Sequence, residues 1–268
     1  MEKNNPVIIS GSSITDDTVW PTWATWIKEL YGLTNVGNFS VKGLGNKTII
    51  LKAIKAAMGC DQPPLIILQL TSVDKWDWYV ENPLIVETLK KEKHPILFLD
   101  AQDTHGFWCT GSHFPLWKEY YQEHYFSLTY QAFETLMMLQ WFQGLCKLKN
   151  WSHQILFESP ILSVTESQLN SGQLSKDDCI SKKLIENVLC DTVPIDLDGI
   201  YLPGLIGYAC LENLSWFHDR YRSHPGSYVH YLFTKDVLSR SFDNFFVRQQ
   251  AIENLEQPAL KFQQLLQQ

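Results

Sequence analysis

The sequence predicts an α/β protein, a three-layer α/β/α sandwich around a mostly parallel, five-stranded sheet. Three observations indicate this fold. Short apolar runs alternate with segments of helical spacing along the chain. The runs are continuously apolar rather than alternating, which is typical of parallel strands buried on both faces. Several runs also end abruptly in small or polar residues, as strands do at the carboxyl edge of an open sheet, where ligands bind.

The individual elements follow from these patterns. Pro21 suits the first turn of a helix and so marks where one predicted helix begins. Gly59 directly follows the next predicted helix and marks where it stops. Ser163–Asp178 is polar and contains Gly and Ser, so we expect a surface loop there. The predicted strands are Pro6–Ser10, Asn35–Ser40, Pro64–Leu70, Pro95–Leu99 and Gln154–Phe157. The predicted helices are Pro21–Tyr31, Asn46–Met58, Leu116–Leu148, Ser181–Leu189, Tyr228–Ser239 and Asn244–Gln267.

Length and composition favour one large domain. The chain has 268 residues, of which 45% are hydrophobic, enough for a single core. We expect one domain over residues 1–268, with a helical insertion near 104–150 and a helical extension over 240–268. The formal net charge of -7 argues against nucleic acid as a partner, because nucleic-acid binding leaves a basic footprint.

The cysteines and the chain start bear on the compartment. The six cysteines are scattered and form no C-x-x-C pair, which suits reduced thiols better than a disulfide framework. The first residues lack the apolar segment of a signal peptide, and no apolar stretch is long enough to span a membrane. The sequence therefore predicts a soluble, cytoplasmic protein without a membrane span, and leaves the oligomeric state open.

One strand end carries a candidate nucleophile. Ser13 lies in Gly11-Ser12-Ser13-Ile14-Thr15-Asp16, directly after the first predicted strand. A serine hydroxyl becomes a good nucleophile only when a base removes its proton, and histidine has a suitable pKa unaided. His224, followed by Pro225 near the other end of the chain, is the candidate base. A turn with a helix cap is the structural alternative for the serine-rich segment.

Three blocks follow strand-like runs, at Gly11–Asp16, Asn38–Asn46 and Leu70–Asp74, and a fourth is His224-Pro225. In this order and spacing they resemble the SGNH/GDSL hydrolase family of esterases, lipases, carbohydrate deacetylases and some acyltransferases, which implies a sandwich of the flavodoxin-like type. The first block resembles G-D-S-I-T, with Ser12 in place of the family's Asp and Ser13 as nucleophile. The block Asn38–Asn46 resembles the loop whose glycine N–H points into the oxyanion hole, which implies Gly43, or Gly45 as the alternative. The last block resembles D-x-x-H-P, which implies His224 as the base.

Two departures from the family pattern stand out. The third block, Thr71-Ser72-Val73-Asp74, should read G-x-N-D, and Val73 cannot donate to an oxyanion as the asparagine does. Losing one such donor costs about 2.7–4 kcal/mol of transition-state stabilisation. No acid lies three residues before His224, where Tyr221 stands; Asp219, five residues before it, is the nearest upstream carboxylate.

The sequence thus predicts a serine esterase or O-acyltransferase acting on an O-acylated glycan or small metabolite, without cofactor or metal. Asp74, Trp76 and Trp78 follow the third strand and are the candidate substrate-binding residues. One alternative is a binding module for a glycan or partner protein, built on the same scaffold with a degraded site. The other is a different enzyme centred on Asp74, Lys75 or Asp100.

Overall fold

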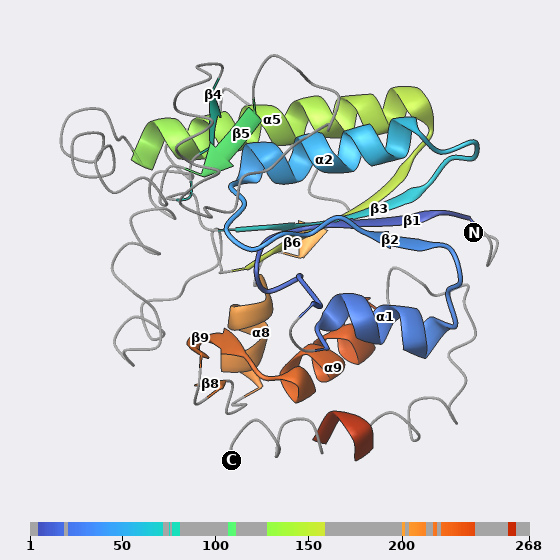
Figure 1. Cartoon of the computed structure of the whole chain (residues 1–268), viewed down its shortest axis with the longest axis vertical. Helices are drawn as coiled ribbons and strands as arrows, with labels where there is room; N and C mark the ends of the chain where they lie inside the picture. The colour runs from blue at the N-terminus through green and yellow to red at the C-terminus, as the bar shows by residue number, and fades with distance from the viewer. Residues whose placement is uncertain are drawn as a thin grey trace.

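The chain forms a three-layer α/β/α sandwich, and Figure 1 shows the sheet edge-on between two layers of helices. The computed structural model describes the sheet, its helices and two small antiparallel strand pairs. The predicted segments Pro95–Leu99, Ser163–Asp178 and Ser181–Leu189 lie outside the described residues. The residues it describes are 5–18, 21–71, 75, 77–80, 107–110, 128–158, 200–201, 204–212, 217–218, 221–238 and 257–260.

Five parallel strands in the order β2-β1-β3-β6-β7 make up the central sheet. Strands β1 and β3 are mostly apolar and fully buried; all six side chains of β3, for example, are buried. The order places β1 between β2 and β3, so that the carboxyl ends of β1, β3 and β6 meet at one edge. The strands are β1 (Val7–Ser10), β2 (Val36–Asn38), β3 (Leu65–Leu70), β6 (Ser152–Phe157) and β7 (Ile200–Tyr201).

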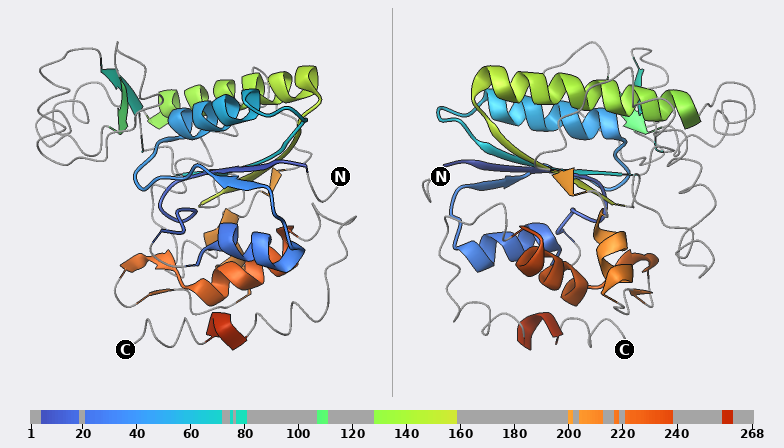
Figure 2. Two further views of the ribbon diagram at one scale, coloured as in Figure 1. Left: turned by 45° about the vertical axis from the view of Figure 1, so that its right-hand side comes forward. Right: turned by 180° about the vertical axis from the view of Figure 1, so that it is seen from behind.

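Helices α2 (Asn46–Met58) and α5 (Leu128–Lys149) lie side by side over one face of the sheet (Figures 1 and 2). Both turn apolar side chains toward it, and Ile49, Ile50 and Phe142 are fully buried there. Cys146 is buried in the same core, and burial raises the pKa of its thiol to about 12. This thiol and that of Cys60 are free, as the scattered cysteines predict.

Helices α1 (Trp23–Tyr31), α8 (Gly204–Leu211) and α9 (Ser227–Asp236) cover the other face. Figure 2 shows residues 257–260 as a short helical turn on the outer side of this layer, where Ala259 is fully buried. The indole Nε1 of Trp26 on α1 donates to the carbonyl of Ser227, the first residue of α9, at 3.1 Å. The start of α9 is therefore anchored to α1.

Several elements agree with the sequence predictions and others were missed. Helix α2 has the predicted bounds, α1 begins two residues later than predicted, and α5 confirms the second part of a longer predicted helix. Strand β7 was missed because its two residues are too short to form a pattern. Also missed were α8 and two antiparallel strand pairs, β4 (Asp77–Val80) with β5 (Phe107–Thr110) and β8 (Phe217–His218) with β9 (Tyr221–Pro225).

The predicted division into a domain, an insertion and an extension remains a prediction. Within the proposed insertion, α5 packs its apolar side chains into the core that it shares with α2. None of the helices in the described ranges combines the length and apolar character needed to cross a bilayer.

Candidate active site

Ser13 lies in a tight turn at the carboxyl end of β1. The amide groups of Thr15 and Asp16 both donate to the carbonyl of Ser12 at 3.0 Å, which closes the turn around Ser13. Ser12 is almost fully buried, whereas Ser13 is half-buried. The serine predicted as the nucleophile is thus the partly accessible one of the pair, at the sheet edge where ligands bind.

Three neighbouring segments fix this turn. The carboxamide oxygen of Gln69, buried in β3, accepts from the hydroxyl of Thr15 and, at 2.8 Å, from the indole N–H of Trp23. The carbonyl of Thr15 accepts from Thr22 Oγ1 and from Asn38 Nδ2, both at 3.1 Å. Because these partners are mostly buried, the turn around Ser13 has a set geometry before any substrate arrives.

The loop between β2 and α2 runs beside the Ser13 turn. The amide of Val41 donates to the carbonyl of Gly11 at 3.2 Å, and Asn38 contacts the turn as described. Gly43 in this loop has φ of 85°, a left-handed conformation that favours glycine. The structure therefore brings the second predicted block next to the first.

Gly45, the alternative oxyanion donor, lies at the start of α2 and has another partner. Its amide donates to Asp77 Oδ1 at 2.9 Å, and the amide of Thr48 donates to Asp77 Oδ2 at 2.8 Å. A glycine at the N-cap has no side chain to satisfy the first amides of a helix, so Asp77 from β4 takes that role. Burial raises the pKa of Asp77 to about 6, against the lowering effect of these hydrogen bonds.

In the third block, Thr71-Ser72-Val73-Asp74, the first residue is held by two hydrogen bonds. Thr71 follows β3 and donates its amide to Asn46 Oδ1 at 2.8 Å, while Asn46 Nδ2 donates to the carbonyl of Thr71 at 3.1 Å. This bidentate contact ties the end of β3 to the start of α2. The remaining block and candidate residues, Ser72, Val73, Asp74 and Trp76, lie outside the described residues, and so does the side chain of Trp78 in β4.

His224 lies in β9, the strand that leads into α9. Two residues beyond Pro225, Ser227 donates its hydroxyl to the carbonyl of Pro21 at 2.9 Å. Pro21 precedes Thr22, the residue that holds the Ser13 turn through Thr15. The helix that follows the His224 block is therefore hydrogen-bonded to the segment that also contacts the Ser13 turn. The side chain of His224 and all of Asp219 lie outside the described residues.

Glu158 joins the strand ends and was not predicted. It follows the last residue of β6, and its Oε2 accepts from Thr71 Oγ1 at 2.6 Å, from Ser12 Oγ at 3.2 Å and from Lys75 Nζ at 3.3 Å. The rule that singled out Ser13, a polar residue directly after a buried strand, applies equally to Glu158. Its partners could not be read from the sequence because Ser12 lies 146 positions away.

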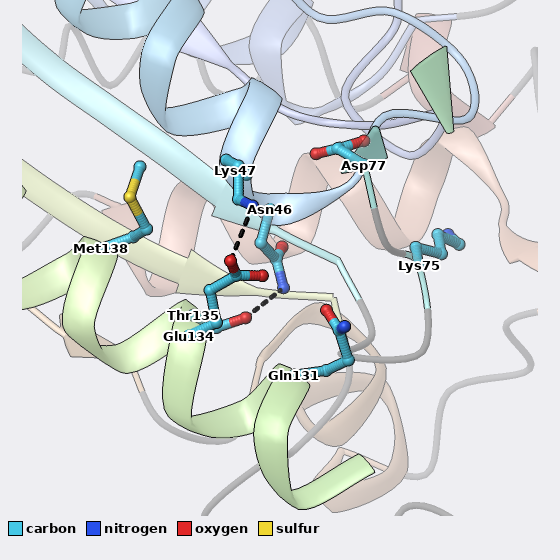
Figure 3. Close-up of a pocket in the computed structure, with 8 residues that line it drawn as sticks. All are labelled: Asn46, Lys47, Lys75, Asp77, Gln131, Glu134, Thr135 and Met138. Atoms are coloured by element: carbon cyan, nitrogen blue, oxygen red, sulfur yellow. Dashed lines mark hydrogen bonds and ion pairs between the residues drawn. The ribbon is translucent and has the colours of Figure 1, made fainter. Parts of the chain in front are cut away.

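A small polar pocket, open to solvent, lies between α2, β4 and α5 (Figure 3). Lys47 and Glu134 form an ion pair of 2.7 Å on one side of it. Lys75 lines the same pocket and contacts Glu158, which links the pocket to the residues around Ser13. Its lining residues are Asn46, Lys47, Lys75, Asp77, Gln131, Glu134, Thr135 and Met138.

No group of three or more His, Cys, Asp or Glu side chains able to hold a metal occurs within the described part of the chain. Among the described residues, the side chains around the Ser13 turn supply hydroxyls, carboxamides, the Lys75 ammonium and the Glu158 carboxylate. This set is suited to positioning a nucleophile and stabilising charge.

Neither a protein-family model nor a curated protein sequence matches the chain. Similar solved structures exist, the first being an acetyl xylan esterase with 14% identity, a TM-score of 0.42 and coverage of 88% of this chain and 98% of its own. An acetylxylan esterase from Geobacillus stearothermophilus has 14% identity and a TM-score of 0.39, with 89% and 95% covered. A lipolytic G-D-S-L family protein from Veillonella parvula DSM 2008 has 12% identity and a TM-score of 0.38, with 87% and 96% covered.

At TM-scores below 0.5 these likenesses add no argument of their own, and the fold assignment rests on the strand order and register of this chain. The structures that the chain resembles include members of the SGNH/GDSL family to which the order of its sequence motifs points.

Proposed function

We propose that this protein hydrolyses an ester, or transfers its acyl group to an alcohol, with Ser13 as nucleophile and His224 as base. One observation carries the proposal. The turn that presents Ser13 at the end of β1 is fixed through Thr15, Thr22 and Asn38, and α9, which follows His224, is anchored one residue from Thr22. These contacts support a site in which the strand that carries His224 lies near the half-buried Ser13.

The chemistry needs only these two side chains and fixed donors. Ser13 Oγ attacks the ester carbonyl carbon while His224 takes the hydroxyl proton. The bond to the leaving alcohol then breaks, and His224 gives the proton to that alcohol. Water, or an acceptor alcohol, attacks the acyl-serine, His224 takes its proton, and that proton returns to Ser13 Oγ as the acid or new ester leaves.

The tetrahedral intermediate carries a negative oxygen that needs N–H donors. The amides of Gly43 and Ser13 are the proposed donors, because the Gly43 loop runs beside the Ser13 turn. Asp219 is the proposed residue that orients His224.

The proposed substrate is an O-acylated glycan or small metabolite with a polar alcohol portion. The pocket of Figure 3 is lined by amides, carboxylates, lysines and a threonine, with Met138 as its one apolar side chain. Such a lining hydrogen-bonds hydroxyl groups and gives little apolar surface to a long acyl chain. Asp74, Trp76 and Trp78 are proposed to extend this binding surface.

Reaction with a fluorophosphonate probe, followed by mapping of the labelled residue, tests the proposal. We expect the label on Ser13, and a loss of labelling rate of at least about 1,000-fold in both Ser13→Ala and His224→Ala. Ser152→Ala, which removes an exposed serine from β6, is the matched control and should label at the wild-type rate. Label on another residue, or an unchanged rate in Ser13→Ala, contradicts the proposal.

A binding module is the second candidate, and the valine at position 73 favours it because the third block lacks its usual oxyanion donor. Calorimetric titration with an acetylated xylo-oligosaccharide separates the two candidates. Binding without release of acetate, in a protein that the probe leaves unlabelled, indicates the module.

A further inference from the structure

A single carboxylate oxygen holds the ends of two strands beside the proposed nucleophile. Glu158 Oε2 accepts three hydrogen bonds, from the hydroxyls of Ser12 and Thr71 and from the ammonium of Lys75. These donors come from the turn after β1 and the segment after β3, while Glu158 itself directly follows β6. The contact therefore ties together the three neighbouring strand ends of the site.

Burial makes this arrangement rigid. Ser12 and Thr71 are almost fully buried, and the side chain of Glu158 is 13% exposed. A carboxylate with little access to water needs donors from the protein, and each buried hydroxyl has a single proton to give. The side chain of Ser12 is thus oriented by Glu158, and Ser12 is the residue directly before Ser13.

Ser12 stands where the block that this chain resembles has an aspartate. Glu158 supplies a negative charge beside Ser12, because its Oε2 accepts from Ser12 Oγ at 3.2 Å. Lys75 balances that charge with an ammonium group at 3.3 Å, in the segment where Val73 replaces a donor.

We propose that Glu158 is a positioning residue for Ser13: it fixes the turn through Ser12 and holds Lys75 as the positive group at this sheet edge. The inference rests on the proposed function for its effect on reactivity. Its geometric part, that Glu158 orders the turn, stands apart from any activity.

Glu158→Gln tests the proposal because it keeps the shape of the side chain and removes its charge. We expect the labelling of Ser13 by the fluorophosphonate probe to slow by about 10- to 100-fold, the range for a lost hydrogen bond to a charged group. Glu158→Asp, which retains the charge, should recover part of the rate. The matched control is Glu29→Gln, an exposed carboxylate on α1, which should label like the wild type.

Two further measurements distinguish positioning from a loss of folding. Hydrogen exchange of the amides of residues 11–16 should accelerate in Glu158→Gln while the amides of β3 keep their protection. Lys75→Met should slow labelling in the wild-type background and have little added effect in Glu158→Gln, since the two groups act as a pair.

The outcomes separate this inference from the proposed function. An unlabelled Ser13 in the wild type defeats the proposed function, and exchange in residues 11–16 then decides the positioning role on its own. Labelling of Glu158→Gln within twofold of the wild-type rate overturns the effect on reactivity. Unchanged exchange in residues 11–16 overturns the positioning role.

Discussion

Two carboxylates stand at the same edge of the sheet and have different partners. Asp77 accepts two main-chain amides at the start of α2, those of Gly45 and Thr48. Glu158 accepts two hydroxyls and an ammonium, all from side chains. Every helix leaves amides unsatisfied at its start, so the need that Asp77 meets is a general one of helical structure.

The side chains around Glu158 meet no such general need. The hydroxyls of Ser12 and Thr71 could donate to other kinds of acceptor than a carboxylate. The side chain of Lys75 is 27% exposed, so water can also accept its hydrogen bonds. Their convergence on Glu158 Oε2 is therefore specific to this site. From this difference we expect Asp77 to serve chiefly stability and Glu158 chiefly the geometry around Ser13. Three further predictions test the expectation for Asp77.

The largest effect is expected for Asp77→Ala. The variant leaves the amides of Gly45 and Thr48 buried without their acceptor, which lowers the free energy of unfolding by about 2 kcal/mol at pH 7.5. Urea denaturation followed by circular dichroism measures this change. If Glu158→Gln lost as much stability as Asp77→Ala, the division of roles between the two carboxylates would be wrong.

A somewhat smaller loss is expected for Gly45→Ala. A Cβ at Gly45 would lie 2.6 Å from both Asp77 Oδ1 and the carbonyl oxygen of Lys75, so the cap has to shift, at a cost of about 1.5 kcal/mol. Gly144→Ala is the matched control, because a Cβ there meets nothing within 4 Å on α5, and it should gain about 0.5–1 kcal/mol. Thermal unfolding of both variants checks the pair, and equal melting temperatures contradict the close approach.

The smallest effect concerns pH. The pKa of Asp77 is raised from its ordinary 3.8 to about 6 in the folded protein, so the folded state binds the proton more tightly than the unfolded chain does. The stability that protonation contributes is fully present below pH about 4 and is lost as pH rises through about 6.

Asp77→Asn removes this titration. Relative to the variant, the wild type should gain on the order of 1 kcal/mol of stability as pH falls from about 7 to about 5. Urea denaturation of both proteins at the two pH values measures the difference. A constant difference between them would show that Asp77 keeps an ordinary pKa.

Much of the fold follows from local patterns in the sequence. The apolar runs of β1, β3 and β6 and the spacing of α2 predict these elements within two residues of their observed bounds. The Ser13 turn was also predicted, because small and polar residues directly after a buried strand indicate a loop at the carboxyl edge. Strand β7 was not, because its pairing with β6 rather than a pattern of its own makes it a strand.

The sequence by itself determined the fold class, because the apolar runs that predict strands and the spacing that predicts helices are local patterns along the chain. It also indicated Ser13, Gly43 and His224 as candidates. Only the tertiary structure decided that Asp77 accepts a hydrogen bond from the amide of Gly45, and that Glu158 accepts one from Ser12, which lies 146 positions away in the sequence. Hydrogen-bond partners of buried carboxylates depend on which strand ends the sheet order brings together, and that order is a property of the whole chain.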